Sequence, residues 1–282
     1  MKKFMIVISL LFPFVLLAQG GRVFDNLKME SKILGMDRKY GIYLPEDYET
    51  SQRSYPVLYL LHGGGGDETN WIQRGDVKHT ADKVIESGDA FSMIIVMPDA
   101  SEVQKGYFNS VKGDWQYEDF FFEEFVPYIE KTYRIKARKR FRAIGGLSMG
   151  AGGTFCYALH HPDLFSAACP LSGGIRPYSE EREASMKERY YKDATEEQIE
   201  QWKKKYDLYA LMENMPEERK NDVRWYIDCG DDDRFSESSG LVHTLMKKKE
   251  IPHEYRVRDG GHNWKYWREA LPEVMKFVSM GF

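Results

Sequence analysis

The sequence of 282 residues has an ordinary globular composition, with 42% hydrophobic and 30% charged residues. Glycine and proline are too infrequent for a collagen-like or low-complexity chain. A net charge of −4, without any basic tract, argues against nucleic acid as a partner. Three cysteines in a chain of this length exclude a disulfide scaffold, and we expect them to be buried, unreactive thiols.

The first residues have the pattern of a secretory signal peptide. Two lysines precede an apolar run, Phe4–Leu17, and the small residues of Ala18-Gln19-Gly20 follow it. This run is shorter than the roughly 20 residues that span a bilayer. We therefore expect a cleaved signal peptide at residues 1–19, a periplasmic or secreted mature protein, and no stable membrane insertion. A buried N-terminal helix or a membrane anchor is the alternative.

Short apolar runs then alternate with helical patterns along the chain. Runs without polar alternation indicate strands buried on both faces, and their alternation with helices indicates a mostly parallel sheet covered on both sides. Ligands bind such sheets beyond the carboxyl ends of the strands. The expected strands are Tyr40–Leu44, Pro56–Leu61, Met93–Met97, Phe141–Leu147, Phe165–Leu171, Val223–Cys229 and Glu254–Val257. The expected helices are Tyr117–Tyr133, Gly150–His160, Ser238–Glu250 and Trp264–Met280.

One segment, residues 176–222, departs from this alternation. It holds 23 charged residues among 47 and no glycine, and its apolar residues recur at helical spacing. We expect a helical insertion between two strands. It is either a lid over the site or a solvated surface excursion.

The sequence Gly146-Leu147-Ser148-Met149-Gly150 matches the pattern G-x-S-x-G. This pattern holds a serine on a tight turn between a strand and a helix, where the flanking glycines avoid Cβ collisions and leave the hydroxyl exposed. The expected strand before Ser148 and the small residues after it supply that context. We therefore expect Ser148 to be a nucleophile; a bystander serine in a glycine-rich turn is the alternative.

A serine hydroxyl needs a general base to react at neutral pH. His262 lies in a Gly-Gly-His-Asn-Trp turn after the last expected strand, where the chain order Ser…Asp…His places the base. The carboxylate that orients such an imidazole is expected after the strand Val223–Cys229. Asp231, Asp232 and Asp233 all follow that strand, and their spacing does not choose among them.

The oxyanion of an acyl-transfer intermediate needs preorganised N–H donors. We expect one donor to be the backbone N–H of Met149 and the others to come from Gly64 and Gly65, in the glycine run after His62. A phosphate-binding role for this run is disfavoured because the G-x-x-x-x-G-K-[ST] lysine is absent. The sequence has neither H-E-x-x-H nor a Cys/His cluster, so we expect no metal and no cofactor.

Several of these motifs together resemble the esterase D-type α/β-hydrolases, and within them carbohydrate esterase family 1, which includes feruloyl and acetylxylan esterases. The motifs are Leu60–Gly66, Met97-Pro98-Asp99, Gly146–Gly152 and Gly261-His262, and the similarity runs from Tyr40 to the end of the sequence apart from the insertion. The resemblance implies an α/β-hydrolase fold for residues 20–282, with residues 176–222 as a helical insertion. The family pattern G-x-x-D matches Gly230 and Asp233, which implies Asp233 as the triad acid, with Asp232 in reserve.

The resemblance further implies a carboxylic ester hydrolase that uses a Ser-His-Asp triad through an acyl-enzyme. Its expected substrates are feruloyl or acetyl groups on plant polysaccharide, on an oligosaccharide, or on a small ester. We expect His62, Trp115 and Trp264 to contact the substrate, since aromatic rings pack against a feruloyl ring or a sugar face; a core role for the two tryptophans is the alternative. An acyltransferase with the same site and a general short-chain esterase are the competing functions. An inactive binding module would require a broken triad. The sequence leaves the oligomeric state open.

Overall fold

The structure is a computed structural model that describes residues 20–101, 105–189 and 191–282. The expected signal peptide at residues 1–19 lies outside the described residues. Within these ranges, no helix combines the length and the apolar character needed to cross a membrane. All three cysteines are buried and none forms a disulfide.

Eight strands of the described chain form one sheet in the order β1-β2-β4-β3-β5-β6-β7-β8. Strands β1 and β2 pair antiparallel, as do β2 and β4, and every later pairing is parallel. The strands are β1 Arg22–Ser31, β2 Met36–Leu44, β3 Val57–Leu61, β4 Ile94–Pro98, β5 Arg142–Leu147, β6 Ala167–Leu171, β7 Arg224–Gly230 and β8 His253–Arg258. Strands β3 to β6 are buried throughout, which explains their almost entirely apolar sequences; the exception is Arg142, at the start of β5.

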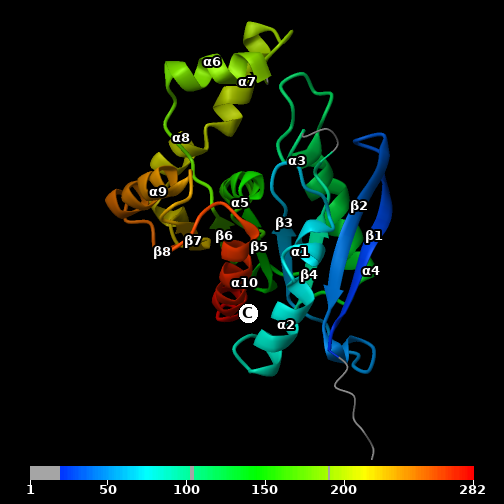
Figure 1. Ribbon diagram of the computed structural model, residues 1–282. Helices are drawn as coiled ribbons and strands as arrows, with labels where there is room; N and C mark the ends of the chain where they lie inside the picture. Colours follow the sequence, from blue (N-terminus) through cyan, green and yellow to red (C-terminus); the bar gives the residue numbers. More distant parts are fainter. Residues whose placement is uncertain (1–19, 102–104, 190) are drawn as a thin grey trace, which may run out of the picture.

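Helices cover both faces of this sheet (Figure 1). The sheet separates the buried hydrophobic residues into two clusters, one under each layer of helices. One face is covered by α1 Asn70–Gln73, α2 Val77–Glu86 and α10 Trp264–Ser279. The other carries α3 Tyr117–Asp119, a π-helix Phe120–Phe125, α4 Val126–Thr132, α5 Met149–His160, α8 Leu208–Glu213 and α9 Ser236–Lys248. The insertion also contains α6 Glu180–Arg189 and α7 Glu196–Tyr206; short 3₁₀ helices lie at Glu46–Tyr48, Lys139–Phe141 and Glu217–Arg219.

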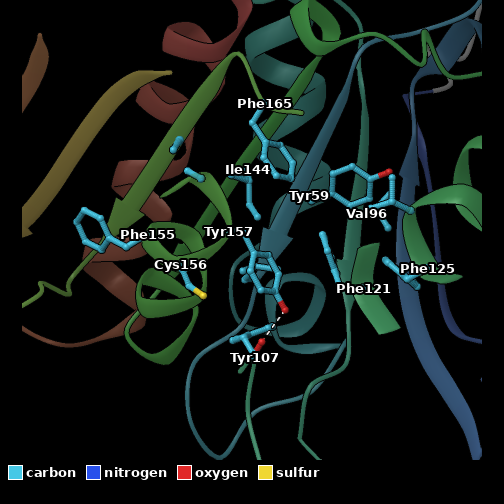
Figure 2. Packing of buried hydrophobic residues seen from close by; sticks show 14 of the residues in the cluster. Tyr59, Val96, Tyr107, Phe121, Phe125, Ile144, Phe155, Cys156, Tyr157 and Phe165 are labelled. Carbon is cyan, nitrogen blue, oxygen red and sulfur yellow. Dashed lines mark hydrogen bonds between the residues drawn. The ribbon is translucent and has the colours of Figure 1, made fainter. Parts of the chain in front are cut away.

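Tyr157 joins the helix that follows Ser148 to the larger core (Figure 2). Its ring packs against Phe121 with the centroids 4.7 Å apart, and its hydroxyl donates to the carbonyl oxygen of Tyr107 at 2.7 Å. The side chain is fully buried. Burial of one large side chain contributes about 1.5–3 kcal/mol, so this contact holds α5 firmly against the segment around Tyr107.

The predicted mostly parallel α/β architecture is confirmed, and each predicted strand has a counterpart in the sheet. Strand β1 was missed because it is an edge strand with mostly exposed side chains and a bulge near Asn26, so it lacks an apolar run. Helix α2 was also missed. Its buried residues Val77, Thr80, Ala81 and Val84 follow the helical spacing i, i+3, i+4, i+7, a signal that was present in the sequence.

Candidate active site

Ser148 lies on a strained turn between β5 and α5, with φ 56° and ψ −113°. A Cβ atom on Gly146 would approach the carbonyl oxygen of Gly150 to 2.7 Å, and one on Gly150 would approach that of Leu61 equally closely. Both positions therefore require glycine. A non-glycine residue at such dihedral angles costs about 1–3 kcal/mol and persists only where the surroundings enforce it.

His262 lies between Ser148 and Asp233 and contacts both. Its Nε2 is 2.9 Å from Ser148 Oγ, and its Nδ1 is 2.9 Å from Asp233 Oδ2 and 3.0 Å from Oδ1. The carboxylate therefore fixes the tautomer with the proton on Nδ1, which leaves the Nε2 lone pair for the serine hydroxyl. This arrangement can generate a serine nucleophile.

Asp233 is held as an ionised acceptor. Its side chain is fully buried, and Oδ1 also accepts the backbone N–H of Phe235 at 2.9 Å. Burial raises the pKa of this carboxyl, but the hydrogen bonds from His262 and the Phe235 amide outweigh it, so the pKa lies below its usual value. The neighbouring Asp232 is exposed, and its backbone N–H donates to the carbonyl oxygen of Gly260.

The loops that carry Asp233 and His262 are joined by close packing that sequence reasoning did not identify. A Cβ on Gly230 would lie 1.9 Å from the carbonyl oxygen of Gly260, so the two loops touch through their backbones. Beneath them, the fully buried Asp228 accepts from Tyr226, Tyr266 and Arg258 at 2.5–2.8 Å. These partners offset the cost of burying the Asp228 carboxylate, and they hold together the ends of β7 and β8 from which the two loops start.

Two of the three residues expected to supply oxyanion donors lie beside Ser148. Gly64 and Met149 line the same cavity as Ser148. The neighbouring Gly63 could not carry a side chain, because its Cβ would approach Leu147 Cδ1 to 2.6 Å. Met149 is the first residue of α5, where backbone N–H groups have no intrahelical acceptor and favour negative charge. Gly65 adopts φ +73° but is not among the residues that line the cavity.

The three residues expected to contact the substrate lie outside the cavity lining. His62 is 1% exposed; its Nδ1–H donates to Gly63 O at 2.8 Å and its Nε2 accepts the Ala100 N–H at 2.9 Å. Burial lowers the pKa of His62, which favours this neutral ring. His62 therefore shapes the glycine loop, and its assignment to substrate contact is corrected.

The assignment of Trp115 to substrate contact is also corrected, because packing takes up its ring. Trp115 is 2% exposed and its indole N–H donates to the carbonyl oxygen of Gly106. Trp264 packs edge-on between Trp71 and Trp267, with centroid distances of 5.4 and 5.2 Å. Trp115 therefore has the core role, whereas Trp264 is partly exposed and its contact with substrate stays a prediction.

A cavity of about 880 Å³ opens beside Ser148 and takes much of its lining from the insertion. Phe108 and Tyr206 stack with centroids 5.0 Å apart and planes 16° apart, and Trp202 packs on Tyr206 at 4.9 Å. We call these three residues the aromatic wall. Phe108 lies against α5 close to the nucleophile, since a Cβ on Gly152 would be 4.0 Å from its ring. The sequence carries no signal that pairs Phe108 with the insertion.

Three comparisons with known proteins bear on the fold and the family. Residues 31–278 match the family model Esterase, described as "Putative esterase". A solved structure titled ferulic acid esterase is 35% identical, with a TM-score of 0.79 over 93% of this chain and 99% of that chain. The chain therefore belongs to the esterase family, and the class that its fold and family define is a carboxylic ester hydrolase of the carbohydrate esterase family 1 type.

Two curated relatives match part of the chain. An esterase of Mycobacterium tuberculosis is 34% identical over 154 residues, which cover 52% of this chain and 31% of that protein. An endo-1,4-beta-xylanase/feruloyl esterase of Xylanibacter ruminicola is 33% identical over 150 residues, which cover 51% of this chain and 20% of that protein. The match thus spans less than a third of the length of each relative.

Proposed function

We propose that this chain is an exported serine esterase that removes feruloyl or acetyl groups from plant polysaccharide, with Ser148, His262 and Asp233 as its catalytic residues. The observation that best supports this proposal is the continuous series of hydrogen bonds from Ser148 Oγ through His262 to Asp233, beside a large cavity. The names of a similar structure and of a curated relative support feruloyl esters as the substrate. Residues 20–282 would form the catalytic domain.

The proposed reaction has two stages. His262 Nε2 takes the proton of Ser148 while Oγ attacks the ester carbonyl, and the oxyanion is stabilised by the N–H groups of Met149 and Gly64. His262 then gives this proton to the departing alkoxide, which leaves as the alcohol and yields an acyl-enzyme. In the second stage, His262 deprotonates water, water attacks the acyl carbonyl, and Ser148 leaves with the proton. Asp233 stays ionised throughout and stabilises the imidazolium.

Product analysis tests the substrate assignment. Initial rates are measured for methyl ferulate, an acetylated xylan and p-nitrophenyl acetate, with wild type and Ser148→Ala. We expect wild type to release ferulate or acetate from the first two, and the variant to release neither. Hydrolysis of p-nitrophenyl acetate alone would reject the polysaccharide substrate and leave a general short-chain esterase. Equal activity of Ser148→Ala on every ester would reject the nucleophile.

A further inference from the structure

Glu118, a buried carboxylate outside the triad, lies where the insertion meets the helix that follows the nucleophile. It is 2% exposed and belongs to α3. Its Oε1 contacts His160 Nδ1 at 2.6 Å, at the end of α5, and His161 Nε2 at 3.5 Å. Its Oε2 accepts from the Tyr206 hydroxyl at 2.6 Å and pairs with Lys205 Nζ at 2.9 Å, both from α7.

A second set of bonds closes the same junction. His160 Nε2 lies 2.8 Å from the carbonyl oxygen of Lys205, so both ring nitrogens of His160 face acceptors. An imidazolium, with two N–H donors, satisfies both at once and pairs with the carboxylate. One buried acid thereby joins the C-terminal ends of α5 and α7.

The bonds of Glu118 extend directly into the cavity. The Tyr206 hydroxyl, which donates to Glu118, also accepts the backbone N–H of Asn109 at 3.1 Å. The side-chain oxygen of Asn109 accepts the backbone N–H of Glu118 at 2.8 Å. The backbone carbonyl oxygen of Asn109 accepts the indole N–H of Trp202 at 2.7 Å. Two members of the aromatic wall are therefore fixed in orientation by a network centred on Glu118.

We propose that Glu118 is a positioning residue that holds the aromatic wall beside Ser148 and thereby sets the affinity of the cavity for an aromatic acyl group. The proposal rests on the proposed esterase function. Glu118 is buried behind Tyr206 and touches no reacting atom. Its loss should release the C-terminal end of α7 and tilt the rings of Trp202 and Tyr206, while the triad keeps its geometry.

The variants separate this role from a general loss of stability. Glu118→Gln removes the charge and keeps the size of the side chain. Tyr206→Phe keeps the ring in the wall but removes the bond to Glu118. The control is Glu130→Gln, because Glu130 forms a largely buried ion pair with Arg142 but lies on α4, away from the cavity lining.

We expect Glu118→Gln to raise KM for methyl ferulate roughly tenfold, equivalent to about 1.4 kcal/mol. Its kcat for p-nitrophenyl acetate should stay within about twofold of wild type, since the small acyl group does not use the wall. Tyr206→Phe should change KM in the same direction, and the double variant should be no worse than Glu118→Gln alone. Glu130→Gln should leave both KM values unchanged.

Hydrogen exchange gives a readout that does not depend on turnover. Amides of α7 should exchange faster in Glu118→Gln and Tyr206→Phe, and those of α10 should not. The proposal is overturned if the amides of α7 exchange as slowly in Glu118→Gln as in wild type. It is also overturned if they exchange faster in the variant while its KM for methyl ferulate is unchanged. If wild type fails to cleave methyl ferulate, the feruloyl assignment fails, and the exchange rate of α7 alone decides the role of Glu118.

Discussion

Ser148 combines a strained backbone with a hydrogen-bonded side chain. Its φ is positive, and the two flanking glycines leave room for the chain to pass close to β3 and its loop. The same turn aims the start of α5 at the cavity. The hydroxyl that we propose as the nucleophile and one of the two proposed oxyanion donors, the Met149 N–H, therefore come from one local distortion.

Removing either end of the Ser148–His262 hydrogen bond should have a similar effect. We expect Ser148→Ala and His262→Ala each to lower kcat for p-nitrophenyl acetate by roughly 10⁴-fold or more, because proton transfer and attack form one step. The double variant should be no slower than either single variant. Multiplicative losses in the double variant would show that the two residues act independently.

The choice between the two adjacent aspartates can be tested by a matched pair. Asp233→Asn should lower kcat by roughly 10⁴-fold, because an amide can hold the imidazole in the wrong tautomer. Asp232→Asn should stay within about threefold of wild type, since its exposed side chain has no bond to His262 among the described contacts. The reverse ranking in steady-state rates would make Asp232 the acid.

At the scale of elements, the loops after β7 and β8 act as one unit because their backbones touch. Gly230→Ala would drive a methyl group into the carbonyl oxygen of Gly260. We expect this variant to lose about 1–3 kcal/mol of unfolding free energy, and its kcat to fall on the order of 10²-fold through displacement of the triad. Both are measured by urea unfolding and steady-state rates.

Gly240→Ala is the matched control for that variant. Gly240 lies within α9, and a Cβ there would meet nothing closer than the Tyr255 hydroxyl at 3.9 Å. Removing a helical glycine should stabilise the protein by about 0.5–1 kcal/mol and leave kcat unchanged. Equal behaviour of the two alanine variants would refute the contact between the loops.

The junction of α5 and α7 should make stability depend on pH. Burial raises the pKa of Glu118, but hydrogen bonds from His160 and His161 outweigh it, and the folded pKa lies well below the ordinary value. A depressed carboxyl pKa stabilises the folded state above the unfolded pKa of about 4.3, and this contribution is lost as pH falls below it.

Urea unfolding from pH 7 to pH 3 tests that sign. Glu118→Gln should be less stable than wild type by about 3 kcal/mol at pH 7, the typical result of breaking a buried ion pair. The gap should narrow below about pH 4.3, because only wild type loses the ionised carboxylate. A gap that stays constant across this range would contradict the depressed pKa.

At the scale of the whole molecule, the described chain begins in contact with α2. The Gly21 N–H donates to Asp82 Oδ1 at 2.7 Å, and the Tyr43 hydroxyl donates to the same oxygen at 2.8 Å. Residues from position 21 onward are thus already part of the folded structure. We expect N-terminal sequencing of the protein from its native host to find a start near Gly20; a start at Met1 would refute cleavage of residues 1–19.

The parallel sheet explains why the candidate site residues could be predicted from separate stretches of sequence. Ser148, Asp233 and His262 each follow the carboxyl end of a strand, and parallel strands bring those ends to one edge. The substrate contacts were misjudged for a different reason. His62 and Trp115 are residue types that ligand sites use, but a ring that faces the core and one that faces a cavity look alike in sequence.

The sequence by itself determined the buried strands, the serine turn and the chain order of the triad, because unbroken apolar runs and glycine spacing have local steric causes. Tertiary structure alone decided which carboxylate meets His262 and where the insertion docks. It also decided that Phe108, Trp202 and Tyr206 form one wall. These outcomes depend on contacts between residues up to 97 positions apart, as between Asn109 and Tyr206, and no local pattern encodes such distances.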